Sequence, residues 1–112
     1  GFLRELFRPS FADDNGKAIS YVWIGDGHSA VCIDPNSARV YAHLWYDGRG
    51  KWYPTLYVSP VAVIPILLRY PVNTIRLRCF PRVALYLGRI NTSSMEVAQD
   101  GVEDMLTALK LI

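Results

Sequence analysis

Apolar and polar residues alternate along the first half of the chain with the period of two that marks a half-buried β-strand. The segments between the alternating stretches are rich in Gly, Asp, Asn and Pro, the residues that favour tight turns. Together the two signals predict a meander of four antiparallel strands, over residues 18–24, 29–34, 39–46 and 51–58.

The pattern changes after the meander and then returns. A Ser-Pro pair at 59–60 is typical of a helix start, whereas Pro65 would interrupt the backbone hydrogen bonds of a long helix. We therefore expect a short helix over 60–70. Alternation resumes in 74–80 and 82–90, which indicates one or two further strands.

The C-terminal segment has the period of an amphipathic helix instead. Ser93 and Glu96 have the spacing of a capping box, in which each side chain accepts a hydrogen bond from the backbone amide of the other residue. Apolar residues then fall on one helical stripe and polar residues on the opposite side. The stripe consists of Ala98, Val102, Met105, Leu106 and Leu109, and the opposite side of Glu96, Gln99, Asp100 and Glu103. This pattern predicts a helix over about 94–110 that lies on the sheet.

The length of 112 residues and the apolar fraction of 51% fit one domain with a packed core. We therefore expect a single α+β domain over 1–112. Its antiparallel sheet would be packed on one face by the C-terminal amphipathic helix. The short helix predicted over 60–70 is a candidate to pack on the same face.

Strand alternation divides the side chains of this sheet between two faces. The face predicted to pack against the helix carries Val40, Ala42, Leu44, Trp52, Leu56 and Val58. The far face is aromatic and basic, and it also takes Arg82 and Tyr86. It supplies the candidate binding residues, which are Arg39, Tyr41, His43, Trp45, Lys51, Tyr53, Tyr57, Arg76 and Arg78. A loop of three or five residues at 47–51 is needed to keep these sets together across the hairpin.

Charge is small in total but uneven along the chain. The formal net charge is +2. Residues 48–95 carry seven basic and no acidic groups, whereas residues 96–112 carry one basic and four acidic groups. The central block predicts a positive surface that faces an anion, an acidic partner or the protein's own acidic helix.

The aromatic and basic face predicts a non-catalytic binding module, because Tyr, Trp and Arg are enriched in binding hot spots. The expected partner is a second copy of the chain, giving a homodimer, or another protein. A structural alternative is that the aromatic residues are good strand formers half covered by the N-terminal segment and by 60–70. Single-stranded nucleic acid is a further alternative, since bases stack on aromatic platforms flanked by Arg and Lys, although no motif of a nucleic-acid-binding family is present.

Catalysis is the remaining alternative, and Cys32 with His43 is its strongest candidate pair. If Val31 and Ile33 face the core, Cys32 lies on the far face as a diagonal neighbour of His43. A separation of roughly 7 Å is too long for a firm thiol–imidazole hydrogen bond, so a buried and unreactive cysteine is the preferred interpretation. The sequence has no paired metal-ligand motif, and neither a metal nor another cofactor is predicted.

The longest apolar run, at 58–68, is broken by two prolines and is too short to cross a bilayer, so no membrane partner is expected. The first residues include Arg4 and Arg8 and do not form the continuous apolar region of a signal peptide. Together with the presence of only two cysteines, Cys32 and Cys79, this favours a reducing compartment. The expected location is therefore the cytoplasm, and the pairing of the two cysteines is left open.

Overall fold

The computed structural model describes residues 14–16, 19–69, 74–76, 82–86 and 88–112, and these form an α+β fold. In chain order the elements are β1 (Val22–Gly25), β2 (Ser29–Ile33), β3 (Val40–Tyr46), β4 (Trp52–Val58), α2 (Pro60–Arg69), β5 (Thr74–Arg76), β6 (Val83–Tyr86) and α3 (Met95–Ala108). Every pair of neighbouring strands among them is antiparallel, and α3 packs on one face. The predicted fold class is therefore confirmed.

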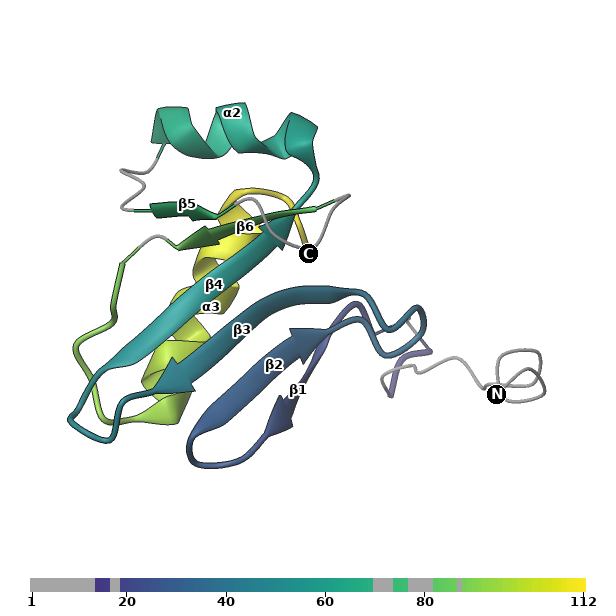
Figure 1. Cartoon of the computed structure of the whole chain (residues 1–112). Coiled ribbons are helices and arrows are strands. Elements are labelled where there is room, and N and C mark those ends of the chain that lie inside the picture. Colours follow the sequence, from purple (N-terminus) through teal and green to yellow (C-terminus); the bar gives the residue numbers. More distant parts are fainter. Residues whose placement is uncertain (1–13, 17–18, 70–73, 77–81, 87) are drawn as a thin grey trace.

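The strands of the described part of the chain form one six-stranded sheet in the order β1-β2-β3-β4-β6-β5 (Figure 1). The first four strands are neighbours in chain order, which confirms the predicted meander. After β4 the chain passes through α2 to the outer edge of the sheet, where β5 lies. It then returns as β6 into the position between β5 and β4. Residues 77–81, the rest of the strand predicted over 74–80, lie outside the described residues.

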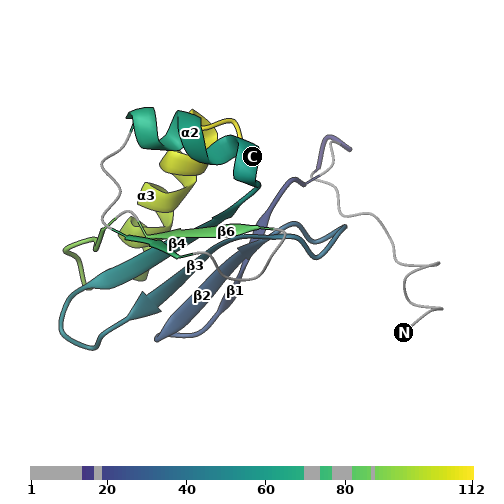
Figure 2. The same cartoon turned by 45° about the horizontal axis from the view of Figure 1, so that its top comes forward.

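Both described helices lie on one side of the sheet, which we call the covered face (Figure 2). Every second strand residue points toward them and enters the core. The core contains Ala30, Cys32, Ala42, Leu44, Trp52, Leu56, Val58 and Leu85 from the strands, Ile66 from α2, and Ala98, Val102 and Leu106 from α3. The core residues predicted for β3 and β4 are confirmed, with the exception of Val40.

Val40 is an exception because β3 contains a β-bulge. Cys32 pairs with Ala42 and Ile33 pairs with Val40, so Tyr41 is an added residue in β3. The added residue shifts the alternation. Tyr41 turns into the core, where it is only 8% exposed, and Val40 turns to the other side of the sheet. The faces predicted for Val40 and Tyr41 were therefore wrong, because regular alternation fails where one strand gains a residue.

β2 also faces the opposite way from the prediction. Ala30 and Cys32 are buried in the core, while Val31 pairs with His43 and lies with Ile33 on the other side of the sheet. Both alternating sets of this strand are apolar, so its sequence does not indicate which set faces the helices. Pairing with the buried residues of β3 decides the orientation.

α3 begins one residue later than the predicted capping box requires. Ser94 is the N-cap, and its hydroxyl accepts a hydrogen bond from the Val97 amide at 3.2 Å. Glu96 therefore stands at the second helical position rather than the third, and the capping box predicted for Ser93 and Glu96 is wrong.

The polar side of α3 is not wholly exposed. Glu103, predicted on the side away from the sheet, accepts a hydrogen bond from the indole of Trp23 on β1 at 2.7 Å. Burial and the nearby Glu103 carboxylate both raise the pKa of Tyr21. Glu103 thus connects the edge strand β1 to the helix.

α2 continues to Arg69 even though Pro65 removes one backbone donor from its interior. Ile66 anchors it in the core, and the Arg69 guanidinium donates a hydrogen bond to the carbonyl of Ala108 at 3.2 Å. Its outer side is exposed and apolar, through Val61, Ile64 and Leu68. Neither described helix combines the length and the apolar composition needed to span a membrane.

Candidate binding surface on the open face of the sheet

The second face of the sheet, which we call the open face, has no helix of the described part of the chain against it (Figure 2). The strand register places on it Val22, Ile24, Ser29, Val31, Ile33, Val40, His43, Trp45, Tyr53, Thr55, Tyr57, Thr74, Arg76, Ala84 and Tyr86. Arg76, in the edge strand β5, is the one charged residue among these register positions. The centre of the open face is therefore uncharged and rich in aromatic and aliphatic residues, and the described basic residues lie at its margins.

Three aromatic rings form a row across β3, β4 and β6. Trp45 pairs with Tyr53, and their ring centroids are 5.6 Å apart at an interplanar angle of 46°. Tyr53 in turn stacks on Tyr86, with 6.2 Å between centroids and an angle of 25°. Trp45 is 52% exposed, so the row ends in a large indole that is open to solvent.

The row depends on the five-residue loop at 47–51, which has one of the two predicted lengths. The Asp47 carboxylate accepts hydrogen bonds from the amides of Arg49 at 2.6 Å and Lys51 at 3.2 Å, and from the hydroxyl of Tyr53 at 3.3 Å. Two loop glycines with φ of 77° and 84° supply left-handed backbone. Burial acts to raise the pKa of Asp47, but these hydrogen bonds outweigh it and the pKa lies below its ordinary value.

The half of the open face formed by β1 and β2 is aliphatic, and the sequence analysis did not identify it. Ile24 pairs with Val31, and Ile33 pairs with both Val22 and Val40. Ile24 is 61% exposed. A signal for this half was present, because a strand whose two alternating sets are both apolar is typical of a sheet that is covered on both faces.

His43 lies between the aliphatic and aromatic halves. Its Nε2 is 2.6 Å from the Ser29 hydroxyl oxygen, and this hydrogen bond holds the imidazole over β2. Cys32 lies on the covered face, where burial and the charge of Glu103 raise the pKa of its thiol to about 12. The expected burial of Cys32 is confirmed. The pairing of Cys32 with His43 as nucleophile and base is contradicted, because the two side chains lie on opposite faces.

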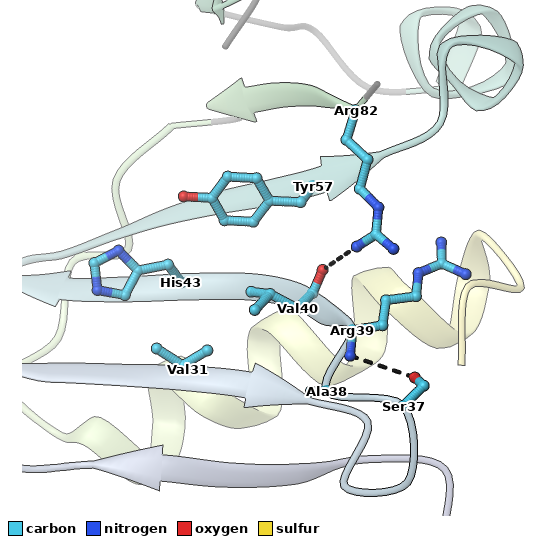
Figure 3. Close-up of a pocket in the computed structure, with 8 residues that line it drawn as sticks. All are labelled: Val31, Ser37, Ala38, Arg39, Val40, His43, Tyr57 and Arg82. Carbon is cyan, nitrogen blue, oxygen red and sulfur yellow. Dashed lines mark hydrogen bonds between the residues drawn. The ribbon is translucent and has the colours of Figure 1, made fainter. Parts of the chain in front are cut away.

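A pocket of about 860 Å³ opens where β3 separates from β4 (Figure 3). Pairing of these strands begins at Ala42, and the bulge carries the preceding residues of β3 away from β4. The pocket is lined by Val31, Ser37, Ala38, Arg39, Val40, His43, Tyr57 and Arg82. The bulge that sequence reasoning missed therefore lies directly beside this pocket.

Two arginines stand at one end of the pocket (Figure 3). Arg82, just before β6, reaches across β4 and donates a hydrogen bond to the carbonyl of Val40 at 3.0 Å. The guanidinium of Arg39 lies 5.1 Å from the centre of the Tyr41 ring, which is a cation–π contact. None of the lining residues that the structure describes is acidic.

The structure brings together only part of the predicted site. The residues His43, Trp45, Tyr53 and Tyr57 share the open face, with Arg39 at one end of it and Lys51 in the loop at the other. Tyr41 belongs to the core instead. Arg76 stands opposite Ala84 in the edge strand β5, so its register position belongs to the open face as predicted, and Arg78 lies outside the described residues.

Within the described ranges, no three His, Cys, Asp or Glu side chains are grouped so that they could hold a metal ion. Comparison of the chain with protein-family models, with curated proteins and with solved structures found no match. Functional inference for this chain therefore depends on its own geometry.

Proposed function

We propose that this protein is a small non-catalytic binding module that associates with a second copy of itself through the open face. The observation that carries the proposal is an extended apolar and aromatic sheet face without a described helix on it. Ile24 and Trp45 on this face are 61% and 52% exposed. Sheets that are apolar on both sides are normally covered on both sides, so a partner for this face is expected.

The residue types of the open face support a macromolecular partner. Trp and Tyr are the residues most enriched in binding hot spots, where a large ring becomes fully desolvated in the complex. Trp45 and Tyr53 form such a pair at the end of the aromatic row. Ile24 and Val31 extend the same surface with aliphatic side chains.

The absence of charge at the centre of the described open face supports a second copy in particular. A twofold interface places one patch against the same patch of its partner, so a charged centre would bring like charges together. Here the central strand positions carry no Asp, Glu, Lys or Arg. Two copies can therefore meet without electrostatic repulsion at the middle of the interface.

The same geometry argues against single-stranded nucleic acid. Base stacking needs aromatic faces that are free, whereas Tyr53 is already stacked on Tyr86 and lies against Trp45. Arg39 and Arg82 are also separated from this row, since they lie at the pocket. Protein association is therefore preferred.

The test is the molar mass of the protein in solution, measured by light scattering after size-exclusion chromatography over a range of concentrations. Wild-type protein is expected to form a dimer at high concentration. Trp45→Ala, alone or combined with Ile24→Ala, is expected to weaken dimerisation about thirty-fold or more, the effect of losing a hot spot worth about 2 kcal/mol. The monomer should remain folded, because both side chains are largely exposed within it.

Leu68→Ala is the matched control, because Leu68 is 84% exposed but belongs to α2. Its dimerisation should equal that of the wild type. Dimerisation lost in Leu68→Ala and kept in Trp45→Ala would assign the interface to α2 and reject the proposal. A wild-type chain that stays monomeric at every concentration, or that elutes with 260 nm absorbance lost at high salt, would reject it as well.

A further inference from the structure

We propose that the pocket beside the β-bulge binds a small organic anion, a carboxylate or phosphate monoester carried on an apolar body. This inference goes beyond self-association and depends on different residues. The pocket lies at the end of the open face where β3 begins, whereas Trp45 and Tyr53 lie where β3 ends and β4 starts.

The positive end of the pocket comes from two arginines on separate elements. Arg39 precedes β3 and Arg82 precedes β6, and both side chains extend toward the same end of the pocket in Figure 3. Their contacts within the described residues are to uncharged groups, a backbone carbonyl for Arg82 and the Tyr41 ring for Arg39. An anion placed here would meet two cationic forks, the geometry that suits carboxylate and phosphate.

Two further observations show that the positive charge is not balanced within the pocket. No described lining residue is acidic. The carboxylate of Asp34, in the turn that leads to Arg39, accepts hydrogen bonds from the Asn36 amide at 2.8 Å and the Ser37 hydroxyl at 2.9 Å. In addition, Nε of Arg39 is buried and has no hydrogen-bond acceptor among the described residues. The arginine end therefore has unused capacity for an acceptor.

The other wall of the pocket explains why an apolar body is expected. Val31, Val40 and the ring of Tyr57 line it, and His43 closes the side toward Ser29. A volume of about 860 Å³ falls in the range of roughly 300–1,000 Å³ that is usual for small-molecule sites. An inorganic ion would fill only the arginine end and leave the apolar wall in water.

Isothermal titration calorimetry with four simple probes tests the proposal. Benzoate and phenylphosphate carry both features, and comparing them distinguishes a carboxylate site from a phosphate site. Benzyl alcohol lacks the charge, and inorganic phosphate lacks the apolar body. We expect saturable one-to-one binding of benzoate or phenylphosphate, at least tenfold tighter than that of either incomplete probe.

Variants then locate the site. Arg39→Gln and Arg82→Gln are expected to weaken binding of the better probe at least tenfold, whereas Arg89→Gln, at an exposed arginine outside the pocket, should leave it unchanged. Arg82→Gln removes both the positive charge and the guanidinium that contacts Val40. Arg82→Lys keeps the charge but not the guanidinium fork, so it shows whether a loss of binding comes from the lost charge or from the lost Val40 contact. Thermal unfolding of each variant confirms that it is folded.

Three results would overturn the proposal: neither benzoate nor phenylphosphate binds, benzyl alcohol binds as tightly as they do, or Arg89→Gln loses as much affinity as Arg39→Gln. Trp45→Ala distinguishes this inference from self-association, since it should disrupt the dimer and retain the anion. Anion binding by a chain that never dimerises would reject only the proposed function.

Discussion

The two faces of the sheet are built from similar residue types and differ in what lies against them. On the covered face, Leu44, Leu56 and Leu85 are completely buried beneath the helices. On the open face, Ile24 and Trp45 remain more than half exposed. Because removing apolar surface from water yields about 25 cal/mol per Å², the covered residues stabilise the monomer and the open ones are available to a partner. The position of the helices, rather than hydrophobicity, therefore distinguishes core from binding surface in this protein.

The largest expected effect concerns the reactivity of Cys32. With a thiol pKa of about 12, roughly one molecule in ten thousand is the thiolate at pH 8, against about a quarter for an ordinary cysteine. In a Cys79→Ser background, a disulfide reagent such as Ellman's reagent should therefore react roughly a thousand-fold more slowly with native than with denatured protein. Equal rates would mean that Cys32 is accessible and that its assignment to the covered face is wrong.

The same raised pKa gives a dependence on pH with a definite sign. The contribution of Cys32 to stability is complete below about pH 8.5, where the thiol is protonated in both states. Above that pH the unfolded thiol ionises and the folded one does not, so the free energy of unfolding should fall. Replacing Cys32 with Ala should remove this part of the alkaline loss, as measured by urea unfolding at pH 7 and pH 10.

Truncating a side chain on each side of the molecule should separate the buried contacts from the exposed ones. Leu106 of α3 is completely buried, and Leu106→Ala is expected to lower the free energy of unfolding by about 3 kcal/mol through lost burial and a residual cavity. Leu68→Ala removes the same atoms from an exposed site and should change it by less than about 0.5 kcal/mol. Urea unfolding at low protein concentration measures both, and similar losses would show that α2 is also covered.

The placement of α3 over the covered face can be tested at its first turn. Ser94→Ala removes the acceptor of the Val97 amide and is expected to cost about 1 kcal/mol. Ser93→Ala, one residue earlier, is the matched control and should fall within about 0.5 kcal/mol of the wild type. A larger loss of stability in Ser93→Ala than in Ser94→Ala would support the capping box predicted from the sequence, with Ser93 as the N-cap.

The smallest effect is expected in the turns that fix the register of the open face. The amides of His28 and Ser29 hydrogen-bond to the Asp26 carboxylate and lower its pKa. A lowered pKa in the folded state gives stability that is present above about pH 4 and is lost as the pH falls further. Asp26→Asn should therefore show a slightly shallower loss of stability between pH 4 and pH 2 than the wild type in urea titrations. An unchanged slope would mean that the carboxylate does not hold this turn.

Regular alternation was enough to predict the sheet, the helix on it and most of the buried residues of β3 and β4. Leu44 and Leu56, for example, follow from period two and a five-residue loop, which are both local properties of the sequence. The fold class was therefore predictable, because local pattern and final structure agree over most of the chain.

The site was less predictable because two of its determinants are not local. The bulge at Tyr41 depends on how β3 pairs with β2, and nothing in the sequence RVYAHLWY marks the added residue. The orientation of β2 has the same origin, since Ala30 and Val31 are both apolar and only pairing selects between them. Once these two features are known, the pocket follows from them.

The position of β6 between β4 and β5 has a consequence for the order in which the molecule assembles. β1 to β4 can pair as the chain emerges, since each strand has its neighbour directly before it. Among the described strands β5 pairs with β6 only, and β6 comes later in the chain, so residues 74–76 lack this strand partner until residues 83–86 have been made. During synthesis the ribosome must therefore deliver β6 before the outer half of the sheet can close. Until then β4 remains an edge strand, which makes this interval the time at which wrong pairing between nascent chains is most favoured.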